Sequence, residues 1–146
     1  MIQRIQSLYL FVATLLMSLT LFLPIATISY DGQTYNLTAF GSLQTIWIGI
    51  LLSLTVVVPL VTIFLFKHRT LQIRLCAVEM VLLLGSLVLY GLYYWITVKS
   101  FENFTLEHLQ FGWAAPMPIV ALILTYLASR AIFKDEMLVR SLDRIR

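Results

Sequence analysis

One acidic side chain, Glu79, interrupts a long apolar stretch of the sequence, and its chemistry stands out from its surroundings. An ionisable group inside a membrane-length segment is costly, so it is a hypothesis for a functional site. At about 1.5 Å of rise per helical residue, Glu79 and Arg130 have similar depths in adjacent antiparallel segments. The sequence therefore predicts an intramembrane ion pair between Glu79 and Arg130. Two alternatives remain open: Glu79 reaches water or pairs with Arg74 or Lys67, or it is a proton-coupled site.

Histidine and cysteine add no catalytic or cofactor pattern to this residue. His68 and His108 fall in connectors, whereas a membrane haem needs axial ligands on facing helices. Cys76 is the single cysteine, which excludes a Cys-x-x-Cys dithiol. The sequence also has no metal-ligand cluster and no Gly-rich phosphate loop. We therefore predict that the protein is not an enzyme and binds no cofactor or metal.

The segments that carry Glu79 and Arg130 have the composition of membrane helices. Of 146 residues, 60% are hydrophobic and 12% are charged, whereas about a quarter of the residues in soluble proteins are charged. A helix needs about 20 mostly apolar residues to cross a bilayer. Four stretches meet that requirement, at residues 8–29, 45–66, 75–96 and 114–133. We predict an all-α integral membrane protein, with residues 1–146 forming one domain built as a bundle of four transmembrane helices.

Basic residues indicate the orientation of these spans. Lys and Arg near span ends are retained on the cytoplasmic side, while Tyr and Trp gather at headgroup level. Of the ten Lys and Arg residues, all but Lys99 belong to one side of the membrane. They precede the first span, lie between the second and third spans, or lie at the end of the fourth span and after it. Tyr and Trp crowd the opposite side. We predict a multi-pass protein with both termini in the cytoplasm, and we interpret the basic residues as orientation signals.

The two connectors on the non-cytoplasmic side have different patterns. Asp31-Gly32 lies between two short runs that contain β-branched and aromatic residues, which predicts a small extracytoplasmic β-hairpin. In the second connector, residues 100–113, Phe101, Phe104 and His108 fall at helical spacing. This pattern predicts a short helix that leans on the membrane surface.

Small and polar residues within the spans predict helix packing. Small residues allow helices to approach closely, and here they recur every fourth position in two spans, at Gly49, Ser53, Ala121, Thr125 and Ser129. Thr and Ser side chains within spans, such as Thr14 and Thr55, are expected to donate to carbonyls of their own helix. Pro59 is expected to kink the second span, because it deletes one helical hydrogen bond.

The residues that follow the fourth span, 134–146, predict an amphipathic cytoplasmic helix at the C-terminus. The four basic and three acidic residues in this segment give a net charge of +1, too low for strong attraction to anionic lipid. An aliphatic stripe mixed with charges suits contact with protein. One face is therefore a candidate surface for docking a partner: Leu138, Val139, Arg140, Leu142, Asp143 and Ile145. The alternative is that this helix lies against its own bundle.

Both ends of the chain carry a resemblance. The chain opens with Met-Ile-Gln-Arg-Ile-Gln, and its tail contains Lys-Asp-Glu, Leu-Val-Arg-Ser and Asp-Arg. With these motifs, the whole chain resembles a family of short, four-span bacterial inner-membrane proteins that are classified only as a domain of unknown function. The resemblance implies a location in the bacterial inner membrane and supplies no activity.

These observations favour a non-catalytic accessory or scaffold subunit of a larger inner-membrane complex. Its expected partners are the lipid bilayer and other membrane subunits or further copies of itself, and no nucleic acid is expected. Two alternatives follow from the same residues: a small homo-oligomeric transporter or channel that uses Glu79, and a membrane sensor with a periplasmic hairpin.

Overall fold

Four long helices and three short strands form the described part of the computed structural model, which covers residues 2–30, 33–41, 45–65, 68–100 and 108–143. The helices are α1 (Ile2–Phe22), α2 (Ile46–Phe64), α3 (Arg69–Ser100) and α4 (Met117–Asp143). The strands are β1 (Ala26–Tyr30), β2 (Gln33–Leu37) and β3 (His108–Phe111). All four helices are long and apolar enough to cross a membrane, so the predicted set of four membrane-length helices is confirmed.

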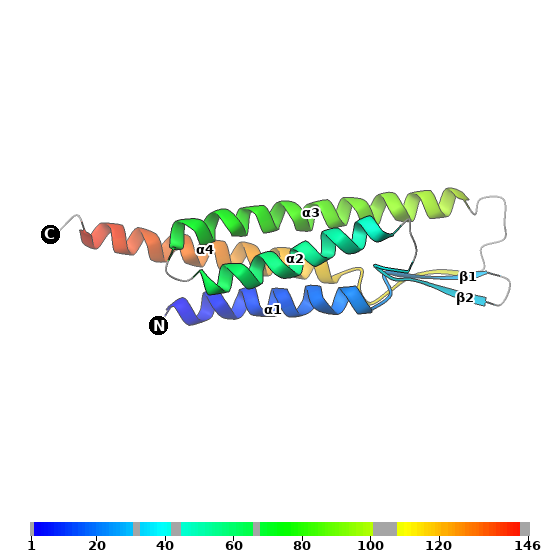
Figure 1. Cartoon of the computed structure of the whole chain (residues 1–146), viewed down its shortest axis with the longest axis horizontal. Helices are drawn as coiled ribbons and strands as arrows, with labels where there is room; N and C mark the ends of the chain where they lie inside the picture. The colour runs from blue at the N-terminus through cyan, green and yellow to red at the C-terminus, as the bar shows by residue number, and fades with distance from the viewer. Residues whose placement is uncertain (1, 31–32, 42–44, 66–67, 101–107, 144–146) are drawn as a thin grey trace.

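The helices form a closed ring in which each packs against two neighbours. The packed pairs are α1 with α2, α2 with α3, α3 with α4, and α4 with α1. Figure 1 shows that the start of α1, the end of α2, the start of α3 and the end of α4 lie at the same end of the bundle, which we call the terminal end. The sheet lies at the opposite end, the sheet end (Figure 1).

The buried positions of the helices follow a spacing of three and four residues. On α3 they are Gln72, Cys76, Glu79, Leu83 and Ser86. This is the seven-residue period with which helices pack side by side in left-handed bundles. The outward positions carry large exposed apolar side chains on every helix, among them Phe11, Val57, Val81 and Ile123. A surface of this kind suits contact with lipid tails.

The first helix ends earlier than the sequence predicts. We expected a span over residues 8–29, but α1 ends at Phe22 and residues 26–30 form strand β1, so that boundary is wrong. Pro24 explains the break, because a proline disfavours helical backbone in the residue before it. The β-branched residues that follow then pair with two strands on either side of β1.

The predicted hairpin is confirmed, and it belongs to a larger sheet. Strands β1 and β2 pair antiparallel, with Tyr30 opposite Gln33, and β3 adds to the other edge of β1 in the order β2-β1-β3. The expected surface helix over residues 100–113 is wrong for residues 108–111, which form β3, while residues 101–107 lie outside the described residues. The edge of β1 that does not pair with β2 offers backbone hydrogen-bond partners to residues 108–111. The spacing of residues within the connector gives no information about these distant partners.

Two further boundaries differ from the predicted spans. Helix α3 is longer at both ends than residues 75–96. Helix α4 runs without a break from Met117 to Asp143, so the fourth span and the amphipathic tail are one helix. Between the sheet and α4, Gly112 donates its N–H to the Ile25 carbonyl at 2.9 Å. A side chain at Gly112 would collide with the Pro24 backbone, which explains the need for glycine at this crossing.

Candidate functional site

The contacts between α3 and α4 place Thr125 at the level of Glu79. Cys76 packs in one apolar cluster with Ala128, and Leu83 packs in another with Ala121. Because the two helices are antiparallel, Glu79 and Thr125 each lie between these two clusters. Both side chains are buried, and Glu79 is only 1% exposed.

The contacts between α2 and α3 place Thr55 at the same level. Gln72 Nε2 donates a hydrogen bond to the backbone carbonyl of Thr62 at 2.9 Å. Glu79 follows Gln72 by seven residues on α3, and Thr55 precedes Thr62 by seven residues on α2. Seven residues are close to two helical turns, so these two residues lie on the same faces as the bonded pair. Thr55 is fully buried.

Helix α1 completes this layer with Thr14. Leu10 belongs to the apolar cluster nearer the terminal end, and Met17 belongs to the one nearer the sheet end. Thr14 lies between them and is buried. Each helix thus contributes one polar side chain to a single level of the interior, which we call the polar layer: Thr14, Thr55, Glu79 and Thr125.

The hydroxyl groups of the three threonines in the polar layer already donate hydrogen bonds within their own helices. Thr14 Oγ1 donates to the Leu10 carbonyl at 2.8 Å. The Thr55 and Thr125 hydroxyls donate in the same way to carbonyls of their own helices, at 2.8 and 2.9 Å. These bonds confirm the expectation that threonines within the spans bond back to their own helix. Each hydroxyl has one proton, so only the lone pairs of its oxygen remain available to a ligand.

The polar layer therefore holds acceptors in excess of donors. Glu79 Oε2 is buried and has no hydrogen-bond partner. Pro59 lies inside α2 and has no N–H, so the Thr55 carbonyl lacks the donor that a regular helix supplies. Because Pro59 is itself buried, this carbonyl lies on the inner side of α2. Burial of unpaired polar groups is costly, so this excess of acceptors calls for an explanation.

Apolar side chains close the polar layer on both sides. The cluster nearer the sheet end includes Met17, Leu52 and Leu83, and the cluster nearer the terminal end is Leu10, Cys76, Ala128 and Ile132. Water is thus kept from the carboxyl group by packed side chains. No group of three or more His, Cys, Asp or Glu that could hold a metal ion occurs in the part of the chain that the structure describes.

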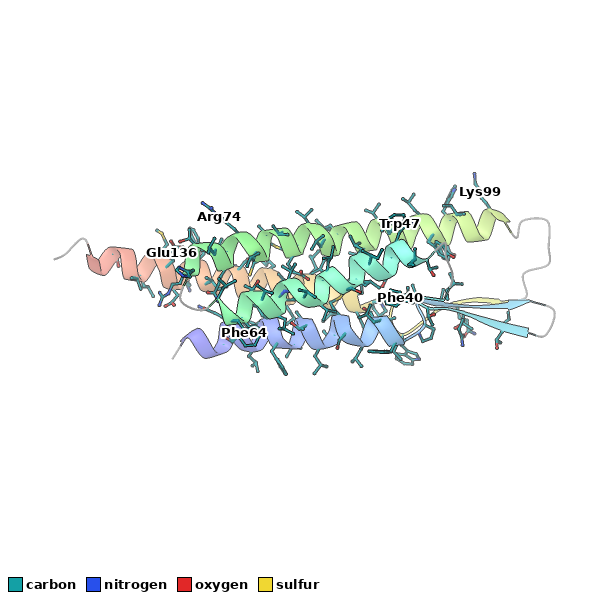
Figure 2. The ribbon with its side chains drawn as sticks, in the orientation of Figure 1. Phe40, Trp47, Phe64, Arg74, Lys99 and Glu136 are labelled. Carbon is teal, nitrogen blue, oxygen red and sulfur yellow. The ribbon has the colours of Figure 1, made fainter. Side chains whose placement is uncertain are left out.

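The structure does not bring the predicted ion pair together. Arg130 is exposed, whereas Glu79 is buried in the interior. Arg130 follows Thr125 by five residues, which turns its side chain about 140° away from the inward face of α4. The prediction compared only the depths of the two residues and took no account of the face of α4 on which Arg130 lies. Arg74, one of the alternative partners, is exposed and points away from the bundle in Figure 2, and Lys67 lies outside the described residues.

The predicted packing residues divide into two groups. Gly49, Ala121 and Thr125 are buried, whereas Ser53 and Ser129 are half-buried. Gly49 approaches the Ala39–Phe40 segment rather than another helix, since a Cβ there would lie 2.8 Å from the Ala39 carbonyl oxygen. On α4 the inward positions are instead spaced by three and four, at Pro118, Ala121, Thr125, Ala128 and Ile132.

The candidate docking face lies on the part of α4 that projects past the bundle. Figure 1 shows the last turns of α4 continuing straight beyond the start of α1 and the start of α3. Leu138 and Val139 are 54% and 41% exposed, and neighbouring Met137 is 54% exposed. Arg140, Leu142 and Asp143 are in the helix, but their side chains lie outside the description, as does Ile145 altogether.

Sequence reasoning selected Glu79 but did not assemble the polar layer. The threonines were each identified as self-bonded, and their common level was missed. A signal was present, because Thr55 and Thr62 on α2, like Gln72 and Glu79 on α3, are seven residues apart on buried faces.

Comparison with protein families gives one finding. The family model described as "Domain of unknown function (DUF4293)" matches residues 2–145, almost the whole chain. The match confirms the resemblance that the terminal motifs indicate. No curated protein and no solved structure matches the chain.

Proposed function

The chain belongs to this DUF4293 family, which brings no activity with it, and we propose that the protein is a non-catalytic accessory or scaffold subunit of a larger membrane complex. The observation that carries this proposal is the projecting end of α4, where Met137, Leu138 and Val139 are exposed. The proposed partner is another membrane protein that offers an aliphatic groove at the terminal end.

Charged residues on α4 directly precede this projecting end. Arg69 Nη1 lies 3.1 Å from Asp135 Oδ2, at the first residue of α3. Lys134 and Glu136 flank Asp135, and Glu136 is labelled near the start of α3 in Figure 2. These charged residues form a belt around the bundle. A hydrocarbon core about 30 Å thick is crossed by about 20 helical residues, and a count of about 20 residues from Met117 along α4 ends at this belt. Met137 to Val139 follow this belt and are the last residues of the membrane-length stretch Met117–Val139, so we propose that they emerge from the membrane at the terminal end.

The direction of α4 argues against lipid as the cover for these side chains. An amphipathic helix that binds the membrane surface lies in the plane of the interface. Helix α4 instead continues along the axis of the bundle, so its last turns point away from a bilayer that the bundle crosses (Figure 1). The near-neutral charge of the tail also gives little attraction to anionic lipid. A protein groove is the cover that fits both observations.

We also propose that the protein lies in a bacterial inner membrane with both termini in the cytoplasm. The start of α1 and the end of α4 share one end of the bundle (Figure 1). Arg4, Arg69, Arg74 and Lys134 belong to that end, whereas Lys99 is near the sheet end. Retention of basic residues on the cytoplasmic side supports this orientation. Labelling of cysteines introduced at Ser141 and Thr34, with a reagent that does not cross membranes, tests it.

The docking proposal is tested with Leu138→Asp in the tagged full-length chain, purified from native membranes in mild detergent. Intact-mass measurement should show one heterologous membrane subunit at fixed stoichiometry with the wild type, and its loss with Leu138→Asp. Ser141→Asp is the matched control, because Ser141 is exposed on the same helix end and already carries a polar side chain. A photo-crosslinker at position 138 should capture the same subunit. Retention of that subunit by Leu138→Asp, or a pure homo-oligomer, would contradict the proposal.

A second candidate function is favoured by one observation, the buried Glu79 carboxyl oxygen without a partner. A small homo-oligomeric transporter or channel would use such a group as its coupling residue. The test is ion or proton flux through vesicles that contain the purified protein. Loss of flux in a folded Glu79→Gln variant supports this function, and absence of flux in the wild type rejects it.

A further inference from the structure

The polar layer offers one buried carboxylate and several neutral oxygen acceptors. We propose that it binds one monovalent cation, a proton or a sodium ion, with the Glu79 carboxylate as the charged ligand and oxygens of Thr55 and Thr125 as neutral ligands. The site is independent of the docking proposal, because it lies in the interior and α4 docks with its projecting end. It also requires no flux, since a bound cation can act on stability alone.

The first argument is the count of donors and acceptors. Glu79 Oε2 has no hydrogen-bond partner. The hydroxyl protons of Thr55 and Thr125 point to carbonyls of their own helices. The Thr55 carbonyl has no N–H from Pro59. Every oxygen that remains at this level is an acceptor, and a proton or a cation is the species that satisfies several acceptors at once.

The second argument is that no basic side chain among those that the structure describes takes this role. Helix α2 has no ionisable side chain over Ile46–Phe64. On α4, Arg130 is exposed, and on α3, Arg74 is exposed. Tyr126 follows Thr125 on α4 but is exposed. The described ionisable groups that pack into the interior near the layer are Cys76, one turn away on α3, and Tyr9 on α1, and both pack in the cluster nearer the terminal end. Neither carries a positive charge.

Other buried polar atoms lie too far along the bundle to donate a hydrogen bond to Glu79. Gln6 Nε2 and Tyr90 Oη are also buried without partners. Leu10 lies on the terminal side of the polar layer, and Gln6 is one helical turn nearer still to the terminal end. Tyr90 follows Glu79 by eleven residues, about 16 Å along α3. None of the described side chains therefore supplies the donor that Glu79 lacks, and we assign that role to a species from outside the chain.

The chemistry of the layer sets the class of cation. One carboxylate balances one positive charge, and hydroxyl and carbonyl oxygens are hard ligands that suit Na⁺ better than soft metals. A calcium site uses several carboxylates and six to eight oxygens, which the layer does not offer. An anion is excluded, because the layer presents acceptors and a negative charge. A proton needs no added space, since it would join Glu79 to one of the acceptor oxygens.

The experiment measures thermal unfolding of the purified full chain in detergent. In one arm, choline chloride is replaced stepwise by NaCl at constant ionic strength and alkaline pH. In the other arm, pH is lowered in a sodium-free buffer. A saturable rise of the midpoint with Na⁺ identifies sodium as the ligand, and a rise only on acidification identifies the proton. In both cases Glu79→Gln should abolish the response, because an amide is a neutral donor that satisfies the acceptors permanently.

Glu136→Gln is the matched control. It makes the same chemical change on α4, outside the polar layer, and should retain the wild-type response. A midpoint that responds to neither Na⁺ nor pH would overturn the proposal. An equal response in wild type and Glu79→Gln would also overturn it.

Two further variants keep the proposal testable if Glu79→Gln does not fold. Thr125→Val preserves the shape of the side chain and removes its oxygen, so it should raise the cation concentration needed for half of the response by about tenfold. Pro59→Ala restores an N–H for the Thr55 carbonyl. It should weaken the response while making α2 more regular, whereas a purely structural role for Pro59 predicts an unchanged response.

Discussion

Glu79 and Asp135 are two carboxylates on adjacent helices of one bundle, and their surroundings are opposite. Asp135 lies at the terminal end, where its side chain is 17% exposed and lies 3.1 Å from Arg69. Arg69 Nη1 also reaches the Asp135 carbonyl at 3.4 Å. Glu79 lies in the interior, 1% exposed, and its Oε2 has no partner. The chain therefore pairs the carboxylate that water can reach and leaves the enclosed one unpaired.

This arrangement is the reverse of what stability alone favours. An exposed carboxylate needs no partner, because water solvates it, and its ion pairs contribute little. An enclosed carboxylate without a cation is among the costliest groups a fold can hold. A leucine at position 79 would extend the apolar spacing of Cys76 and Leu83 without that cost. The difference supports the proposal that Glu79 serves a ligand, whereas Asp135 contributes one contact between α4 and α3.

The largest effect is expected from reversing the enclosed charge. Glu79→Lys places an ammonium about 15 Å along α3 from Arg69, too deep for the side chain to reach the terminal end. We expect a loss of about 3 kcal/mol or more of stability, and a small folded fraction after purification. Asp135→Lys is the comparison, and it should purify as a folded protein. Size-exclusion chromatography and thermal melting measure both. Equal folding of the two variants would show that Glu79 is not enclosed.

Removing the enclosed charge should stabilise the protein. In sodium-free buffer at alkaline pH, Glu79→Gln supplies an amide donor to the acceptors of the polar layer. We expect unfolding to cost about 1–3 kcal/mol more than in the wild type, because an unsatisfied buried group is relieved. A structural ion pair with Arg130 predicts the opposite sign, a lower melting temperature. Thermal melting in detergent separates the two hypotheses. A lower melting temperature in Glu79→Gln, with no further decrease when Arg130→Gln is added to it, would restore the ion-pair hypothesis.

The sequence predicts the helices better than it predicts their partners. Four apolar stretches and the Asp31-Gly32 turn are local signals, and the structure has four membrane-length helices and a β1–β2 hairpin. Strand β3 depends on the free edge of β1, about eighty residues earlier in the chain. Hydrophobicity alone also could not place the end of α1, because the strand β1 that follows it is itself rich in apolar and β-branched residues.

The candidate site shows the same division. Glu79 stands out in sequence because a charge in an apolar stretch is a local contrast. Its neighbours Thr14, Thr55 and Thr125 are ordinary span residues, and their meeting depends on the register between helices. That register is set by contacts such as Gln72 with Thr62, which join residues on different elements. For the same reason the face of Arg130 could not be predicted, since rotating α4 by one or two residues would change it.

A smaller effect is expected at a polar group that is enclosed and paired. Gln72→Leu removes the Nε2 donor from the Thr62 carbonyl, which lies in the last turn of α2. We expect a loss of about 1–2 kcal/mol, because the carbonyl loses its bond and keeps its burial. Thr62→Val is the control, since it leaves the Thr62 carbonyl in place. Thermal melting should show a larger fall for Gln72→Leu, and equal falls would show that the bond does not hold α2 to α3.

The smallest effect is expected from the ion pair at the terminal end. Arg69→Gln, Asp135→Asn and the double variant form a thermodynamic cycle that isolates the coupling between the two side chains. Because both are partly exposed, at 29% and 17%, we expect a coupling of about 0.5 kcal/mol that falls further in high salt. Asp135→Asn keeps the bond from Arg69 to the Asp135 carbonyl, so α4 should remain in place. A coupling of about 3 kcal/mol, insensitive to salt, would mean that the terminal end excludes water as the polar layer does, and Glu79 would then differ from Asp135 only in lacking a partner.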